Sequence, residues 1–154
     1  MSFVQAGIGD QQTQSYVAGV TWQVPWKHQF SYVALSGRLE ADFGRWSTRV
    51  NHSTSDSWCT ELGVVPVLRV QRRPLSPWFM EIGVGPNYIA PIFHTGEKRF
   101  GTKFNFGDHV GIGRRFDTTH PIELALRTEH FSNAGIRHPN PGENFLQVRV
   151  SIAL

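Results

Sequence analysis

Residues 122–132 read Ile-Glu-Leu-Ala-Leu-Arg-Thr-Glu-His-Phe-Ser, and this short stretch decides the class of fold. The even positions from 122 to 126 are apolar. Glu123, Arg127 and Glu129 occupy odd positions. Successive side chains on a strand point to opposite sides of the sheet, so an apolar residue at every second position gives one apolar and one polar face. The stretch therefore predicts a β-strand with charged residues on one face.

The same two-residue period continues along the rest of the chain. No stretch fits the 3.6-residue period of a helix better than it fits alternation. Seven further alternating segments cover residues 4–8, 16–24, 33–44, 58–69, 78–87, 105–113 and 146–154. Short turns are expected at 25–28, 71–74 and 117–120, and longer loops at 47–57, 88–103 and 133–142. The sequence thus predicts eight consecutive hairpin-connected strands in one domain, residues 1–154, with the chain ending inside the eighth strand.

The composition fits one folded domain and limits the class of protein. Of the 154 residues, 40% are hydrophobic and 18% are charged, and the 15 glycines and 9 prolines suit a protein of strands and turns. No apolar run approaches the roughly 18 to 20 residues of a transmembrane helix, so we expect no spanning helix. No basic-then-apolar export signal is found, so we expect any such signal to have been removed already. The single Cys59 excludes an internal disulfide and a cysteine-rich metal site.

Eight antiparallel strands of about ten residues are enough to close the smallest barrel, which removes unpaired strand edges. In a soluble lipid-binding barrel the apolar face points inward, whereas in an outer-membrane barrel it faces lipid and the polar face fills the interior. Here the polar face carries both acids and bases, with glycines among them, as a narrow salt-bridged interior requires. These charged residues are Glu40, Asp42, Glu61, Glu81, Glu123, Glu129, Arg38, Arg69, Arg127 and Arg149.

Aromatic residues favour the membrane orientation. Trp22, Trp58, Trp78 and Tyr88 lie on the apolar face near predicted strand ends, where the interfacial residues of a membrane barrel are found. The sequence therefore predicts an all-β fold, an eight-stranded antiparallel transmembrane β-barrel with a solid polar interior. Its expected location is the bacterial outer membrane.

The apolar face of residues 122–132 ends with two polar side chains, His130 and Ser132. Residues at i and i+2 lie side by side on one face of a strand, here the lipid face near the loop end. A polar residue where a strand leaves the bilayer costs about 0 to 1 kcal/mol, so an ordinary interfacial role is compatible with the pair. The pair also suits a nucleophile and its base, because a serine hydroxyl reacts once an imidazole takes its proton. Spacing alone leaves both interpretations open.

The segment from His130 to Asn144, His-Phe-Ser-Asn-Ala-Gly-Ile-Arg-His-Pro-Asn-Pro-Gly-Glu-Asn, resembles the active-site stretch of the PagL family, the outer-membrane lipid A 3-O-deacylases. The order of strands and the segment 104–108, Phe-Asn-Phe-Gly-Asp, resemble that family too, so the resemblance covers essentially all 154 residues. It implies a barrel whose outward His-x-Ser pair hydrolyses the ester-linked acyl chain at the 3-position of lipid A. Carried over, His130 is the base and Ser132 the nucleophile.

The resemblance also sets expectations for the rest of the site. Asn133, Gly135 and Asn140 are candidates for the oxyanion site, as side-chain or backbone donors. No metal or organic cofactor is implied, and the expected partners are lipopolysaccharide, through its lipid A, and membrane lipids. A homodimer is compatible with this picture.

The third catalytic group is left open among three residues. The family's acid follows a Pro-Asn-x-Gly stretch, and a gap-free match puts Asn144 in its place, with Glu143 one residue early. Strand parity points Asn144 toward lipid and Glu143 inward, unless a bulge brings Glu143 to His130. We favour Glu143 through such a bulge, with Asn144 as an orienting amide the alternative. Asp108 is a supporting acid, because an index sum near 238 across the 117–121 turn sets it beside His130.

The basic residues give a weaker signal. The net charge of +3 and the pI near 9.4 suit an anionic partner. Bases alternate with acids along the strands and form no patch, so nucleic acid is not expected as a partner. Lys98, Arg99, Lys103 and Arg137 fall in the longer loops, where they meet either lipid A phosphates or water.

Two functions compete with the esterase. A non-catalytic small outer-membrane barrel, for adhesion or structure, would remove no acyl chain from lipid A. A soluble lipid-binding barrel would stay in solution without detergent. Mass spectrometry of lipid A before and after incubation with the protein separates the esterase from both.

Overall fold

The computed structural model describes residues 1–49, 56–73, 76–116 and 119–153. Residues 50–55 of the predicted loop, Pro74, Asp117 and Leu154 lie outside these ranges. The elements in chain order are β1 (Ser2–Gly9), η1 (Asp10–Gln12), β2 (Gln14–Gln29), β3 (Val33–Arg49), β4 (Asp56–Arg72), β5 (Trp78–Ala90), β6 (Phe104–Arg115), β7 (Ile122–Ser132) and β8 (Glu143–Ile152). Among the described residues, no helix has the length and apolar character needed to cross a membrane.

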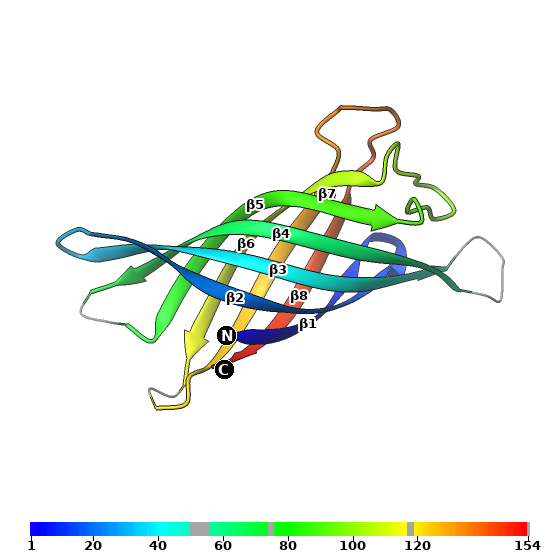
Figure 1. Ribbon diagram of the computed structural model, residues 1–154. Helices are drawn as coiled ribbons and strands as arrows, with labels where there is room; N and C mark the ends of the chain where they lie inside the picture. The colour runs from blue at the N-terminus through cyan, green and yellow to red at the C-terminus, as the bar shows by residue number, and fades with distance from the viewer. Residues whose placement is uncertain (50–55, 74–75, 117–118, 154) are drawn as a thin grey trace.

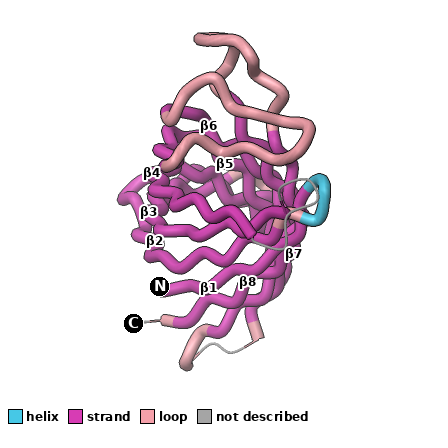
Figure 2. Tube along the Cα trace, turned by 90° about the vertical axis from the view of Figure 1, so that its right-hand side faces the viewer, coloured by secondary structure: helices cyan, strands magenta, loops and turns pink. Residues whose placement is uncertain are grey.

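The eight strands form one closed barrel in which each pairs antiparallel with the next and β8 pairs with β1. The closing register runs from Ser2↔Ile152 to Gly9↔Phe145, so the two ends of the chain lie side by side at one end of the barrel (Figure 1). The opposite end carries η1 and the loops 91–103 and 133–142, which Figure 2 shows from that side. The predicted fold class is confirmed.

Alternation along the strands sorts side chains to the two faces of the wall. On β5, the side chains of 78–88 alternate between exposed and buried without a break. The predicted aromatic residues Trp22, Trp58, Trp78 and Tyr88 all point outward and are about half exposed, between 45% and 53%. Apolar side chains that face outward on every strand are the surface that lipid requires, because a membrane barrel buries its polar face inside.

The middle of the interior is filled by ion pairs. Arg127 donates to both carboxylate oxygens of Glu40, at 3.0 and 2.9 Å, and also to Glu81 at 2.9 Å. Arg69 makes a bidentate pair with Glu123, at 2.7 and 2.6 Å. All five side chains are at most 4% exposed. Buried charges are tolerated when they are paired and hydrogen-bonded, and the predicted solid polar interior has this arrangement.

The loop end of the interior is filled by aromatic rings. Trp46 on the barrel wall packs against Phe131 and against Phe93 and Phe100, which come from the loop 91–103. We call this group the aromatic cluster; its members are Trp46, Cys59, Ile89, Phe93, Phe100, Phe131 and Phe145. Because loop residues are part of a buried core, the loop is fastened to the barrel rather than free above it.

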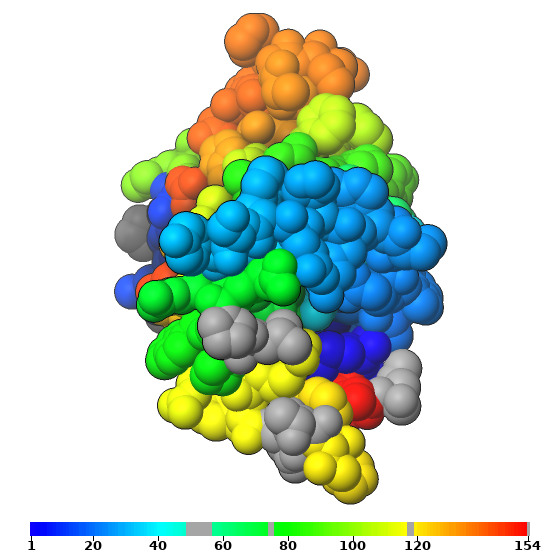
Figure 3. All heavy atoms as spheres, turned by 90° about the vertical axis from the view of Figure 1, so that its left-hand side faces the viewer, coloured from blue at the N-terminus to red at the C-terminus, as the bar shows by residue number. Residues whose placement is uncertain are grey.

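Strands extend into several segments that the sequence assigned to loops or turns: residues 47–49 belong to β3, 56–57 to β4 and 88–90 to β5. The turn predicted at 25–28 is part of β2, which continues to Gln29, and the hairpin that joins β2 to β3 projects toward the viewer in Figure 3. The register shifts between Gln23 and Lys27, so Pro25 lies in an irregularity where its missing N–H breaks no ladder hydrogen bond. At the other terminus β8 stops at Ile152, before the end of the chain.

Candidate active site

His130 and Ser132 project outward from the loop end of β7. Phe131 between them is 1% exposed and belongs to the aromatic cluster, while both polar neighbours are partly exposed on the outer face. The outward side chains before them are Ile122, Leu124, Leu126 and Thr128. The predicted parity of this strand is confirmed, because alternation is continuous from the bilayer face to the site.

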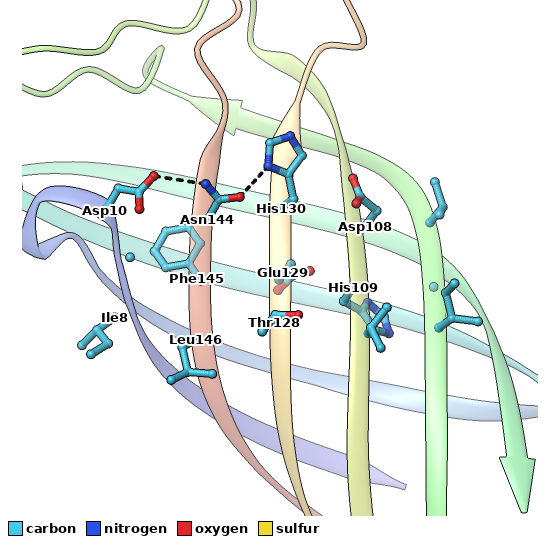
Figure 4. Close-up of a pocket in the computed structure, with 15 residues that line it drawn as sticks. Ile8, Asp10, Asp108, His109, Thr128, Glu129, His130, Asn144, Phe145 and Leu146 are labelled. Atoms are coloured by element: carbon cyan, nitrogen blue, oxygen red, sulfur yellow. Dashed lines mark hydrogen bonds between the residues drawn. The ribbon is translucent and has the colours of Figure 1, made fainter.

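The His130 ring lies in a row of polar residues that crosses neighbouring strands (Figure 4). Its register partners are Asp108 on β6 and Asn144 on β8. The pairing of Asp108 with His130 has the index sum of 238 that the short turn predicts. The ring hydrogen-bonds to the other neighbour: His130 Nδ1 is 2.8 Å from Asn144 Oδ1.

The direction of this hydrogen bond fixes the imidazole tautomer. Asn144 Nδ2 donates to Asp10 Oδ2 at 3.2 Å, and a carboxylate only accepts, so the amide oxygen must face the ring. An amide oxygen also only accepts, so the proton of neutral His130 lies on Nδ1. The lone pair of Nε2 is then available as a base.

Asp10, in η1, connects Asn144 to two further charged residues. Its Oδ2 accepts from Lys98 Nζ at 2.6 Å, and Lys98 Nζ is 3.3 Å from Glu143 Oε2. The hydrogen bond from Lys98 lowers the pKa of Asp10 below its ordinary value, so Asp10 is ionised at neutral pH. A continuous path therefore runs from Glu143 inside the barrel, through Lys98, Asp10 and Asn144, to the outward ring.

Glu143 does not lie beside His130, and the bulge expected to bring it there is absent from the described strands. The β7–β8 register is continuous from Ile122↔Ile152 to Phe131↔Glu143. Glu143 therefore points inward, with its side chain 0% exposed, and Asn144 points outward. Because side chains on a strand alternate, one residue of offset is enough to separate the carboxylate from the ring by the thickness of the wall.

Ser132 is the last residue of β7 and begins the loop that leads to β8. In the described part of the chain Ser132 forms no hydrogen bond with His130. Residues two positions apart on a strand are separated by roughly 7 Å along it. The two side chains therefore share one face, but the strand geometry alone does not bring them into contact. Catalytic hydrogen bonds are often long in unliganded enzymes and tighten with substrate.

The loop after Ser132 is held by two asparagines. Asn133 is 1% exposed; its N–H donates to Asn140 Oδ1 at 2.9 Å, and its Nδ2 donates to the carbonyl of Arg137 at 2.7 Å. Ile136 N–H donates to the Asn133 carbonyl at 3.0 Å, with positive φ at Ala134 and Gly135 between them, a tight type I′ turn. The side chains of both asparagines thus shape the loop, and among the described residues the N–H groups of Ala134 and Gly135 have no hydrogen-bond acceptor.

Gly142 is a site residue that sequence reasoning missed. Its φ is +70°, and a Cβ atom there would lie 2.6 Å from Cε1 of His130. At that distance the ring would have to move, so glycine suits both the left-handed backbone conformation and the present position of the ring. The predicted Pro-Asn-x-Gly stretch contains this residue, and the left-handed preference of glycine was the available signal.

Asp10 and Lys98 were also missed as site residues. Asp10 is 134 residues from Asn144 along the chain, and no spacing pattern links them. Lys98 was expected to meet phosphate or water, whereas its ammonium group is paired with Asp10 and Glu143. Only barrel closure and the folded loop 91–103 bring these residues together.

An exterior groove of about 550 Å³ runs from the polar row down the barrel wall. Asp10, Asn144, His130 and Asp108 lie at its polar end (Figure 4). Its apolar lining comes from outward residues of four strand elements and includes Ile8, Ile82, Val84, Val110 and Leu146. A groove that is polar at one end and apolar along its length suits a molecule with a polar head and a hydrocarbon chain.

Comparison with known proteins agrees with this geometry. Residues 14–153 match the family model described as lipid A 3-O-deacylase (PagL). The chain is 32% identical over 148 residues to the lipid A deacylase PagL of Bordetella bronchiseptica, covering 92% of this chain and 76% of that protein. It is 28% identical over 146 residues to the lipid A deacylase PagL of Pseudomonas aeruginosa, covering 90% and 79%.

A solved structure shows the same fold. The crystal structure of the outer membrane enzyme PagL superposes with a TM-score of 0.83 at 23% sequence identity, and the match covers 99% of each chain. The family match spans most of the chain and extends through the His-x-Ser pair and the loop that follows it. The chain therefore belongs to the PagL family of lipid A 3-O-deacylases.

Proposed function

We propose that this chain removes the 3-hydroxyacyl chain ester-linked at the 3-position of lipid A, with Ser132 as nucleophile and His130 as general base, in the outer leaflet of the bacterial outer membrane. The observation that carries the proposal is the pair itself. It lies on the lipid face of a transmembrane strand, and the His130 ring is hydrogen-bonded through Nδ1 so that Nε2 is left as the base.

The reaction proceeds in two balanced steps. Ser132 Oγ attacks the acyl carbonyl carbon as its proton passes to His130 Nε2, and a tetrahedral oxyanion forms. When it collapses, the bond to the sugar oxygen breaks and His130 returns the proton to that oxygen, leaving an acyl-serine. Water then attacks the acyl-serine with His130 as base, and a free 3-hydroxy fatty acid and the original serine are released.

The oxyanion requires donors close to Ser132. The N–H groups of Ala134 and Gly135 face no acceptor within the described chain, and they follow the nucleophile in a tight turn. We assign the oxyanion site to these backbone donors, because preorganised N–H groups stabilise the charge that develops in the transition state. Asn133 and Asn140 contribute by holding the turn in place.

Substrate reaches the site laterally, from within the membrane. The groove along the wall accommodates an acyl chain, while the polar end lies at the level where β7 and β8 meet their loop. An ester between a sugar and a hydrocarbon chain lies at the boundary between headgroup and hydrocarbon, which is the depth at which a strand changes from apolar to polar. Placing the nucleophile outside the barrel therefore matches the position of the scissile bond.

Two substitutions test the chemistry directly. Ser132→Ala removes the nucleophile and His130→Ala removes the base; each should lower deacylation by about 10³-fold or more and leave a folded barrel. The assay is mass spectrometry of lipid A in detergent or liposomes, in which one lost hydroxyacyl chain gives a fixed mass decrease. Ser31→Ala, an exposed serine at the opposite end, is the matched control and should retain activity.

The outcomes separate the esterase from its competitors. Full activity in Ser132→Ala would show that the nucleophile is wrongly assigned. Wild-type protein that removes no chain from lipid A would contradict the esterase and leave a non-catalytic membrane barrel.

A further inference from the structure

We infer that Asp10 is a positioning residue for this reaction: through the amide of Asn144 it supplies the negative charge that a histidine base requires behind its ring. The inference rests on the proposed function, since it concerns how His130 is held as a base. It assigns to η1, an element before the second strand, a part in chemistry that takes place on the seventh.

Asp10 lies in register with Asn144 and His130. The β1–β8 register ends with Ile8↔Leu146 and Gly9↔Phe145, and one more step along it sets Asp10 opposite Asn144. The next strand over sets Asn144 opposite His130. Asp10, Asn144 and His130 therefore lie in one row across the barrel wall, and Figure 4 shows their side chains pointing toward one another.

The two hydrogen bonds of this row have the same direction. His130 Nδ1 donates to Asn144 Oδ1 at 2.8 Å, and Asn144 Nδ2 donates to Asp10 Oδ2 at 3.2 Å. Both bonds run the same way, from ring to amide to carboxylate. Hydrogen bonds in a chain polarise one another, so the carboxylate makes the amide oxygen a stronger acceptor for the ring N–H. An amide alone holds the tautomer, but an amide backed by a carboxylate also stabilises the imidazolium that forms during attack.

Asp10 is itself held in place by Lys98. Lys98 Nζ is 2.6 Å from Asp10 Oδ2 and is also paired with Glu143, whose side chain is inside the barrel. The lysine comes from the loop 91–103, which is fastened by Phe93 and Phe100 in the aromatic cluster. The carboxylate is thus fixed by a second partner, which bonds to the same oxygen as Asn144, and its hydrogen bond with Lys98 keeps it ionised.

Asp108 is the other acid beside His130, and the geometry disfavours it for this role. It is the register partner of His130 on β6 and borders the same groove. Among the described residues, however, His130 Nδ1 is hydrogen-bonded to Asn144. Asp108 therefore does not accept the proton that orients the ring.

The test exchanges the side chains at positions 10 and 144 of the row. In wild-type protein, Asp10→Asn should lower kcat about tenfold, since neighbours in one hydrogen-bond network are coupled. In the N144D background the carboxylate contacts the ring directly, so adding D10N should cost nothing or raise kcat by removing repulsion between two carboxylates. The double variant D10N/N144D keeps the bond from the ring to residue 144 and lets the amide at position 10 donate to the carboxylate at position 144, so it should restore wild-type kcat to within about threefold.

A structural role for Asp10 gives a different result. If Asp10 only fastens η1 to Lys98, then D10N lowers kcat by the same factor whether residue 144 is asparagine or carries the N144D substitution. Equal factors in the two backgrounds, or no loss from D10N in wild-type protein, would overturn the inference. Glu97→Gln is the matched control: it neutralises a neighbouring acid that contacts Gln11 and not Asn144, and it should leave kcat unchanged.

Failure of the inference is distinguishable from failure of the proposed function. Wild-type and Ser132→Ala proteins are assayed in the same series, so an inactive wild type or an active Ser132→Ala variant contradicts the esterase whatever Asp10 does. An active wild type, an inactive Ser132→Ala variant and an unchanged D10N variant contradict only the role of Asp10. Folding of every variant is checked by its heat-modifiable migration in detergent gels.

Discussion

The interior of this barrel is filled by two kinds of chemistry, and their positions explain their roles. In the middle, Arg127 and Arg69 pair with glutamates from other strands, and both guanidinium groups are about 2% exposed. At the loop end, Trp46 packs against Phe93 and Phe100 from the loop 91–103. The ionic middle connects strand to strand, whereas the aromatic cluster connects strands to the loop that carries Lys98.

Stability and activity therefore depend on different parts of the interior. A membrane barrel must place polar residues inside along the bilayer, and paired charges fill that space at a lower cost than isolated buried charges would. The site is outside the barrel and near the loops, so it depends on what fixes the loops. We expect damage to the middle to lower stability first, and damage to the loop end to lower activity beyond its effect on stability.

The largest effect is expected in the ionic middle. Arg127→Ala leaves Glu40 and Glu81 buried without their shared partner, which should lower the free energy of unfolding by about 3–5 kcal/mol. The measurement is urea unfolding of the protein in liposomes. Arg72→Ala, at an exposed position, should change it by less than about 0.5 kcal/mol. Equal losses in the two variants would show that the buried pairs are not what stabilises the barrel.

An intermediate effect is expected in the aromatic cluster. Phe100 is 2% exposed, and Phe100→Ala should lower the free energy of unfolding by about 2–3 kcal/mol, less than a fully enclosed ring because a loop can relax into the space. Since Lys98 is in the same loop, kcat of the folded fraction should fall as well. Phe104→Ala removes a ring that is 44% exposed and should affect both quantities less. A Phe100→Ala variant with unchanged kcat would contradict the link between this cluster and the site.

The smallest effect on stability is expected beside His130. Gly142→Ala places a Cβ atom 2.6 Å from His130 Cε1 at a φ of +70°, so the ring must move while the left-handed conformation costs about 1–2 kcal/mol. Gly37→Ala, on β3 and away from the site, adds a Cβ atom whose nearest neighbours are 3.5 Å away. Comparing the kcat values of the two variants isolates the ring contact. If both lose the same activity, displacement of His130 is not the cause.

Much of the fold could be predicted because its determinants are local. The period of two predicted the outward and inward residues of each strand, and the short turn expected at 117–120 predicted the register that pairs Asp108 with His130. The error at Pro25 has a physical cause: a proline ends a regular ladder, but an irregularity in the pairing lets a strand continue past it. The sequence pattern cannot tell a turn from such an irregularity.

Some features of the candidate site also have local determinants, whereas others depend on residues far apart in the chain. The His-x-Ser pair and its outward direction follow from alternation on one strand, and parity already indicated that Asn144 faces outward and Glu143 inward. The bulge that we preferred for Glu143 would have been an exception to that alternation, and the continuous β7–β8 register excludes it. Asp10 and Lys98 had no local signal at all.

Short stretches of the chain were enough to predict the number of strands, the inward or outward face of strand residues and the position of His130 and Ser132 on the lipid side, because these depend on neighbours one or two positions away. Which groups connect to His130 through hydrogen bonds depends on the closed barrel. Closure of the barrel joins the first strand to the last, and the aromatic cluster brings in a distant loop, so residues 134 positions apart become hydrogen-bonded. Contacts of that kind depend on the closed register of the whole barrel, which no single stretch of the chain contains.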